Sequence, residues 1–169
     1  MKINFWKLGI AILVSIYFFR YATHPGAGYF IDNANLLIHE AGHLVFGGMG
    51  RVMMFLGGSL FQILVPIIFV GYFLYSEQYF SGALALFWVG ENIINVSVYI
   101  GDAQARILPL LTGDFDGHDW YNLLGDFNLL PQAGVISQIV YFVGVAVLLL
   151  AAVLAIKFSF KSQRPEIIG

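Results

Sequence analysis

The sequence predicts an all-α protein, a polytopic transmembrane helical bundle that forms a single integral membrane domain over residues 1–169. Two observations support this prediction. Of the 169 residues, 59% are hydrophobic and only 11% are charged, whereas soluble globular domains carry roughly 25% charged residues. The few charges gather at the edges of apolar runs that are long enough to cross about 30 Å of hydrocarbon. Composition and patterning therefore indicate a protein whose main solvent is the lipid bilayer.

Five apolar runs have the length of membrane spans, and the first two differ in the ionisable residues that they contain. The first, residues 4–19, contains one charge, Lys7, whose long side chain can reach the interface. A signal peptide would also have a basic start and an apolar core, but no small-x-small cleavage site follows, and Arg20 comes directly after the core. We therefore expect a retained helix. The second span, residues 33–50, contains two histidines and a glutamate.

The remaining three spans surround a polar segment. Residues 52–75 form a span without charge, and residues 80–101 form a span whose one formal charge is Glu91. Residues 102–131 are polar and interrupted by glycines and prolines, so we expect an interfacial segment, because unpaired backbone groups cannot face lipid. Residues 134–156 complete the bundle as an uncharged span.

The charges at the span ends do not decide the orientation in the membrane. With five spans, the basic residues divide equally between the two sides, and the positive-inside rule gives a tie. The two groups are Lys2, Lys7, Arg51 and Arg106, and Arg20, Lys157, Lys161 and Arg164. The chain has no cysteine, which excludes disulfides and thiolate metal ligands. It also has no basic patch, so we expect lipid and no nucleic acid as a partner, and the oligomeric state stays open.

The stretch NLLIHEAGHLVF places chemically active side chains inside the second span. His39 and His43 are four residues apart, so they share one helix face and can bind one zinc ion. Glu40 lies about one step round the helix and can reach a water on the same metal, the general-base position of HExxH metalloproteases. The pattern also occurs by chance, and polar groups can simply bond to neighbouring helices. However, ionisable groups near the bilayer centre cost roughly 2.5 to 3.5 kcal/mol each, so we expect a zinc site.

One further protein ligand is expected, because catalytic zinc usually has three. The polar segment offers three candidates, Asp119, His118 and Asp116, in that order of preference. An aspartate is favoured because Zn²⁺, two neutral imidazoles, one carboxylate and an ionised Glu40 sum to zero charge, which suits a low-dielectric site. The aromatic residues and leucines after Asp119 can anchor a short interfacial helix that begins there. His24 is expected at the surface.

The fourth span carries a polar stripe of Glu91, Asn92 and Asn95, which lie within about one helical turn of one another. One interpretation is bonding between helices, worth about 0.6 kcal/mol per bond on average. The other is that Asn92 and Asn95 position a substrate by holding the backbone of an unwound helix beside the zinc, since an opened helix needs its amides bonded.

Several motifs together resemble the site-2 protease family of intramembrane zinc metalloproteases. They are HEAGH in a membrane helix, a glycine-rich turn after it, the stretch GGSLFQILVP, and a later LPLL segment with Asp-Gly. The resemblance implies a three-helix core over about residues 33–130, with an aspartate completing the zinc site. The Asp-Gly pattern points to Asp116, whereas GHDWYNLL resembles an acidic motif of some short bacterial relatives and points to Asp119. The Gly-Pro-x-x-Asn pattern of the family is not reproduced, and no PDZ domain is attached, so a minimal form is expected.

We therefore expect an intramembrane zinc metalloprotease that hydrolyses a peptide bond of a membrane-spanning or membrane-adjacent substrate through a zinc-activated water. Glu40 would move the proton. The resemblance to bacterial proteins suggests the bacterial cytoplasmic membrane. One alternative is a non-catalytic zinc-binding membrane protein, a pseudoprotease or helix-binding chaperone, against which the intact Glu40 argues. Another is a proton or ion pathway through Glu40, Glu91 and Asp102, which predicts activity without metal.

Overall fold

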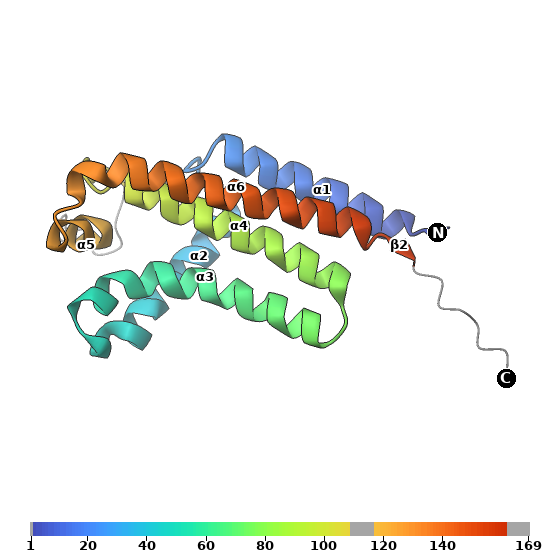
Figure 1. Cartoon of the computed structure of the whole chain (residues 1–169), viewed down its shortest axis with the longest axis horizontal. Coiled ribbons are helices and arrows are strands. Elements are labelled where there is room, and N and C mark those ends of the chain that lie inside the picture. Colours follow the sequence, from blue (N-terminus) through green and yellow to red (C-terminus); the bar gives the residue numbers. More distant parts are fainter. Residues whose placement is uncertain (1, 109–116, 162–169) are drawn as a thin grey trace.

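The computed structural model describes residues 2–108 and 117–161, and these residues are almost entirely helical (Figure 1). The helices are α1 (Phe5–Thr23), α2 (Phe30–Phe46), α3 (Arg51–Tyr75), α4 (Tyr79–Gly101), α5 (Asp119–Asp126) and α6 (Ala133–Lys157), with the short 3₁₀ turns η1 (Gly47–Met49) and η3 (Leu130–Gln132). The two-residue strands β1 (Lys2–Ile3) and β2 (Phe160–Lys161) pair antiparallel and tie the two ends of the helical region together. The predicted all-α class is confirmed.

Four helices in the described part of the chain are long and apolar enough to cross a membrane. They are α1, α3, α4 and the stretch Leu130–Lys157 that contains α6, and they correspond to the predicted spans 4–19, 52–75, 80–101 and 134–156. Large apolar side chains on their outer faces are exposed, for example Leu13, Phe142 and Val153. Such outward-facing apolar surface is compatible with insertion in lipid.

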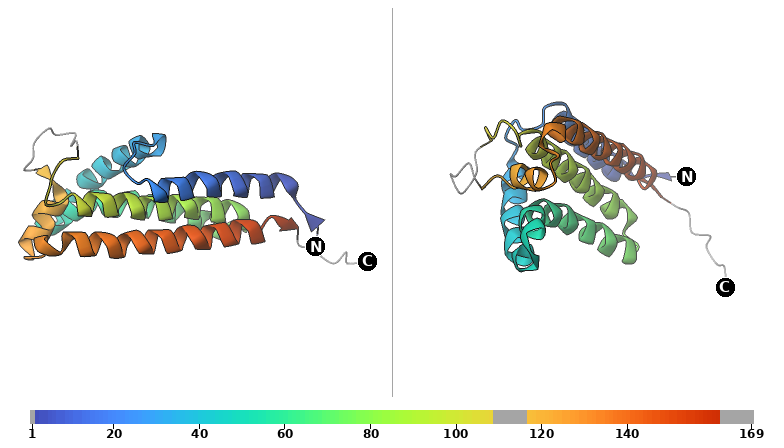
Figure 2. Two further views of the ribbon diagram at one scale, coloured as in Figure 1. Left: turned by 90° about the horizontal axis from the view of Figure 1, so that it is seen from above. Right: turned by 60° about the vertical axis from the view of Figure 1, so that its left-hand side comes forward.

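The predicted span 33–50 has a different form in the structure. Its helix, α2, has 17 residues and is not among the four candidate spans. At 1.5 Å per residue it is about 26 Å long, shorter than the hydrocarbon layer of about 30 Å. It stops at Phe46 because glycines follow, and Gly50 adopts a φ of 98° before α3 begins. Figure 2 shows α2 at a clear angle to α1, α4 and α6, which run alongside one another.

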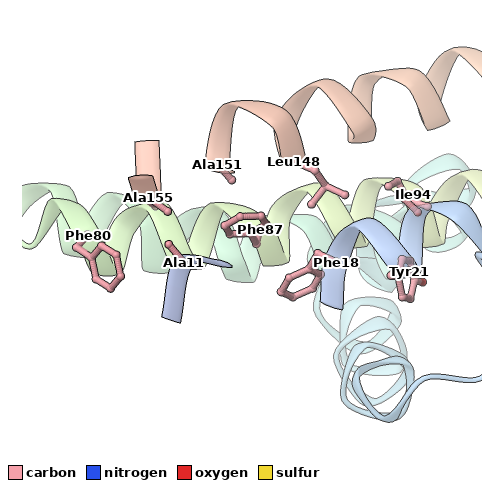
Figure 3. Close-up of a cluster of buried hydrophobic side chains, with 11 residues drawn as sticks. Ala11, Phe18, Tyr21, Phe80, Phe87, Ile94, Leu148, Ala151 and Ala155 are labelled. Carbon is pink, nitrogen blue, oxygen red and sulfur yellow. The ribbon is translucent and has the colours of Figure 1, made fainter. Parts of the chain in front are cut away.

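The main core lies between α1, α4 and α6 (Figure 3). Small residues let these helices approach closely: Ala11, Ala151 and Ala155 are completely buried. The rings of Phe18 and Phe87 stack with their centroids 5.6 Å apart. Lipid is as apolar as these side chains, so packing rather than the hydrophobic effect must drive the association of such helices in a membrane.

A second close approach brings α3 against α2. A Cβ atom on Gly42 would collide with the carbonyl oxygen of Gly57, and one on Gly58 would lie 2.5 Å from Nε2 of His39. Both helices therefore need glycine at the crossing. This contact is what places the α3 backbone directly beside the first histidine of HEAGH.

Candidate metal centre

Three side chains that are far apart in the sequence converge between α2 and α5. Oδ2 of Asp119 lies 3.0 Å from Nε2 of His39 and 3.2 Å from Nε2 of His43. The potential ligand atoms of all three residues lie within 4.8 Å of one another. His39 and Asp119 are buried, and His43 is partly exposed. The two histidines share a face of α2, as their four-residue spacing predicts, and the first residue of α5 supplies the carboxylate.

The start of α5 is held by side chains on both sides of Asp119. His118 is the N-cap residue, and its Nδ1 accepts a hydrogen bond of 3.2 Å from the backbone N–H of Tyr121. The hydroxyl of Tyr99, from α4, donates to Oδ2 of Asp119 at 3.3 Å and accepts from the Asp119 backbone N–H at 3.2 Å. Tyr99 thus contacts both the backbone and the carboxylate of Asp119, which restricts where that carboxylate points.

The body of α5 is attached to α3. The indole N–H of Trp120 donates to Oγ of Ser59 at 3.0 Å. At the other end of α5, Arg51 forms an ion pair with Asp126, with Nε 2.7 Å from Oδ2. Leu123 and Leu124 are buried, on the apolar side of this eight-residue helix. The predicted short helix beginning at Asp119 is therefore present, and its tryptophan and leucines attach it to the rest of the protein. Its place at a membrane interface stays a prediction.

His118 is adjacent to Asp119 but does not join the cluster. Its Nε2 lies 3.3 Å from Oδ2 of Asp102, and its Nδ1 is engaged by the Tyr121 backbone. Burial lowers the pKa of His118, outweighing the opposite effect of Asp102, so the ring is neutral near pH 7.

The charge of Asp119 is set by burial and by its two histidine partners. Burial raises the pKa of Asp119, but the hydrogen bonds to His39 and His43 outweigh this effect and hold the pKa below its ordinary value. Asp119 is therefore an ionised carboxylate.

The other ring nitrogens of the two α2 histidines also have partners. Nδ1 of His43 lies 2.6 Å from the backbone oxygen of Met54. Because a carbonyl oxygen can only accept, Nδ1 of His43 must carry a proton. Nδ1 of His39 lies 3.0 Å from Oε1 of Gln62. A hydrogen bond from the far nitrogen to a protein oxygen is the usual arrangement for histidines that bind metal.

A cavity of about 560 Å³ opens onto these residues. His39, Glu40, His43 and Asp119 line it together, and much of the remaining wall is apolar, with side chains such as Phe55. Within residues 2–108 and 117–161, the Glu40 carboxylate has neither a hydrogen-bond nor an ion-pair partner. It is therefore available to a group that enters the cavity.

The proposed substrate-positioning residues occupy different surroundings. Asn95 lines the cavity, whereas Asn92 is completely buried and is not part of the lining. The amide nitrogen of Asn35 donates to both carboxylate oxygens of Glu91, at 2.9 and 2.8 Å. The polar stripe on α4 thus does make bonds between helices. His24 is exposed, as expected, and the candidate ligand Asp116 lies outside the described residues.

The sequence did not predict the contacts of two residues, Gln62 and Tyr99, with the candidate metal ligands. Gln62 stands out as an amide in a span without charge, so its polarity was a usable signal, although nothing linked it to His39. Tyr99 gave no signal, since an aromatic residue near a span end reads as an interfacial residue. Its contact with Asp119 depends on how α5 packs against α4, which the sequence alone does not specify.

The two imidazoles and one carboxylate form a donor set of nitrogen and oxygen atoms that suits zinc. The arrangement opens on a cavity that the Glu40 carboxylate also lines, so the site combines a candidate metal position with a candidate base. No protein-family model matches the chain, and the comparisons with curated proteins and with solved structures found no match.

Proposed function

We propose that the protein is an intramembrane zinc metalloprotease, which hydrolyses a peptide bond of a membrane-spanning or membrane-adjacent protein or peptide. The observation that supports this best is the convergence of His39, His43 and Asp119 beside Glu40 in one cavity. The HExxH spacing on α2 gives His39 and His43 the roles of metal ligands and Glu40 the role of the base.

The residues present fit a zinc ion. His39, His43 and Asp119 would hold it, and with Glu40 ionised the total charge would be zero, which limits the cost of burial. Bound there, zinc would supply Lewis acidity, lowering the pKa of a water and polarising the scissile carbonyl. Zinc is preferred over harder cations because two of the three donors are imidazole nitrogens.

The protein's own groups would carry out the proton transfers and bind the substrate. The Glu40 carboxylate would accept a proton from the attacking water and return it to the leaving amine. The apolar part of the cavity wall would take up hydrophobic side chains of a membrane-derived peptide, as small-molecule and peptide sites commonly do. Tyr99 would keep Asp119 aligned during these steps.

The setting would be a lipid bilayer, and the resemblance to short bacterial relatives favours the bacterial cytoplasmic membrane. The proton-pathway alternative is less well supported, because its three acids have separate surroundings. Glu91 is bonded to Asn35, and Asp102 is bonded to His118 and to the backbone N–H groups of residues 107 and 108. Glu40 lines the cavity without either of them.

The test uses the full-length protein purified in detergent and reconstituted in liposomes. We expect one zinc per chain by elemental analysis, cleavage of a transmembrane peptide, and loss of both after chelation. Changing His39 and His43 together to Ala should abolish zinc binding. Equal zinc in that double variant would refute the site. Zinc binding without cleavage across a broad panel of membrane peptides would instead favour the non-catalytic zinc-binding protein.

A further inference from the structure

A continuous line of hydrogen bonds leads from His39 on α2 through α3 and α4 to an acidic residue at the start of α2, with a branch to α1. Nδ1 of His39 lies 3.0 Å from Oε1 of Gln62 on α3. Nε2 of Gln62 donates to Oδ1 of Asn95 on α4 at 2.9 Å. Nδ2 of Asn95 donates to Oδ1 of Asp32 at the start of α2, at 3.2 Å, and to the hydroxyl of Tyr21 on α1, at 3.1 Å. Tyr21 itself donates to Asp32 at 3.0 Å.

Asp32 determines which group donates and which accepts at each hydrogen bond along this line. Both carboxylate oxygens of Asp32 accept hydrogen bonds, Oδ2 from the Tyr29 backbone N–H and Oδ1 from the Tyr21 hydroxyl, so Asn95 must turn its NH₂ group toward Asp32. Its oxygen then faces Gln62 and requires the NH₂ group of Gln62. The remaining Gln62 oxygen faces His39, and it requires a proton on Nδ1. Each step follows from the previous one, because an amide has its donor at one end and its acceptor at the other.

His39 needs such a device and His43 does not. The partner of His43 is a backbone carbonyl, which can only accept. The partner of His39 is a side-chain amide, which can turn over and offer its NH₂ group. In that state Nδ1 would become the acceptor, and the neutral ring would hold its one proton on Nε2, the nitrogen that must lose its proton to bind a metal. The orientation of the Gln62 amide must therefore be fixed by its other hydrogen-bond partner.

We propose that Asp32 selects the tautomer of His39, acting through Asn95 and Gln62, so that Nε2 is free to bind the metal. This inference rests on the metal site of the proposed function, and it makes all three residues positioning residues. It also assigns Asn95 to the support of His39 instead of to the substrate, since both ends of its amide are already bonded inside the protein.

Asp32 is well suited to this role because it is held in place itself. Its Oδ2 accepts from the backbone N–H of Tyr29 at 2.7 Å, as part of the capping box that begins α2. An amide at this position can keep the cap with its oxygen and present its NH₂ group to Asn95. The variant Asp32→Asn should therefore preserve the helix start and reverse the line of hydrogen bonds.

The first measurement is zinc affinity of the full-length protein in detergent. We expect Asp32→Asn to weaken zinc binding by about 10- to 100-fold, the usual effect of losing a group that orients a ligand. Adding Gln62→Glu should recover at least about 10-fold of that loss, because the introduced carboxylate can only accept from Nδ1. A purely structural role for Asp32 predicts no such rescue.

The second measurement is the ¹⁵N NMR signal of His39 Nδ1, which distinguishes a protonated from an unprotonated nitrogen. We expect a protonated Nδ1 in the unmodified protein, with or without zinc, and an unprotonated Nδ1 in Asp32→Asn. The NMR result remains informative if the protein proves not to be a protease or not to bind zinc, so failure of the proposed function can be told apart from failure of this inference.

Ser97→Ala is a matched control, because Ser97 is a buried polar residue two positions from Asn95 and its hydroxyl donates to the Ile94 carbonyl oxygen of the same helix. It should leave zinc affinity and the Nδ1 signal unchanged.

Asn95→Leu is a second test variant. It removes the hydrogen bonds between Gln62 and Asp32 and leaves the capping box at the start of α2 unchanged, so it should weaken zinc binding even if Asp32→Asn does not fold. Unchanged Nδ1 protonation in Asp32→Asn, or a double variant as weak as Asp32→Asn alone, would overturn the proposal.

Discussion

Oδ2 of Asp119 lies 3.0 Å from Nε2 of His39, although 80 positions separate the two residues in the chain. The contact exists because α5 is attached to α3 through Trp120 and Ser59 and to α4 through Tyr99. The candidate metal centre is therefore formed by tertiary packing as much as by the HEAGH motif.

Asp119→Asn is expected to weaken zinc binding more than any other change in the polar segment, because it replaces a charged ligand. His118→Ala should cost less, about 10- to 100-fold, because His118 caps α5 and bonds to Asp102 without reaching the α2 histidines. Competition with a zinc-sensitive dye measures both affinities. If His118→Ala empties the site while Asp119→Asn leaves it filled, the third ligand is misassigned.

Glu40→Gln should retain zinc and lose turnover. The amide has nearly the same shape as the carboxylate but cannot accept the proton of the water, and loss of a general base typically costs about 10² to 10⁴ in rate. Zinc content and cleavage of a reconstituted transmembrane peptide are measured on the same sample. Cleavage at the normal rate would exclude Glu40 as the base.

Gly58→Ala should disturb His39 directly. The added Cβ atom would lie 2.5 Å from Nε2 of His39, so the imidazole must move away from the position that faces Asp119. We expect weaker zinc binding with the helices intact. Gly71→Ala on the same helix is the control, because its Cβ would meet nothing within 4 Å and alanine favours a helix over glycine. Equal zinc affinity in the two variants would contradict the assignment.

The pairing of β1 with β2 predicts that the chain crosses the membrane an even number of times. Figure 1 shows α1 and α4 running in one direction and α3 and α6 in the other, so four crossings bring both paired strands to the same side. The chain has no cysteine, which allows single introduced thiols to report on sidedness. A membrane-impermeant maleimide should label Ile3→Cys and Gln78→Cys from one side and Gln132→Cys from the other.

Five crossings, with α2 as a complete span, would give a different labelling pattern. The thiol at position 3 would then share a side with the thiol at position 132, and the thiol at position 78 would lie opposite. This result would support the five-span arrangement. It would place β1 and β2 on opposite sides of the membrane, so the two strands could not pair.

The apolar runs of the sequence locate α1, α3, α4 and α6 to within a few residues, since the length of a span follows from the thickness of the bilayer. The run at 33–50 is harder to interpret. The sequence shows a glycine-rich turn after HEAGH, but the predicted span includes these glycines, whereas α2 ends at Phe46. His39, His43 and Glu40 follow from helical spacing alone. Charge favours a carboxylate as the third ligand, and the anchoring residues after Asp119 rank it first, but its contacts with Tyr99 depend on packing between distant segments.

Part of the cavity lining comes from residues near helix ends. Val98 and Tyr99 lie within three residues of Gly101, where α4 ends, and Met54 lies three residues after the start of α3. Three helical residues span about 5 Å along the axis. If the protein is the proposed protease and α4 ends at a membrane surface, the one water that each hydrolysis consumes would come from the adjacent aqueous phase, without a channel through the hydrocarbon.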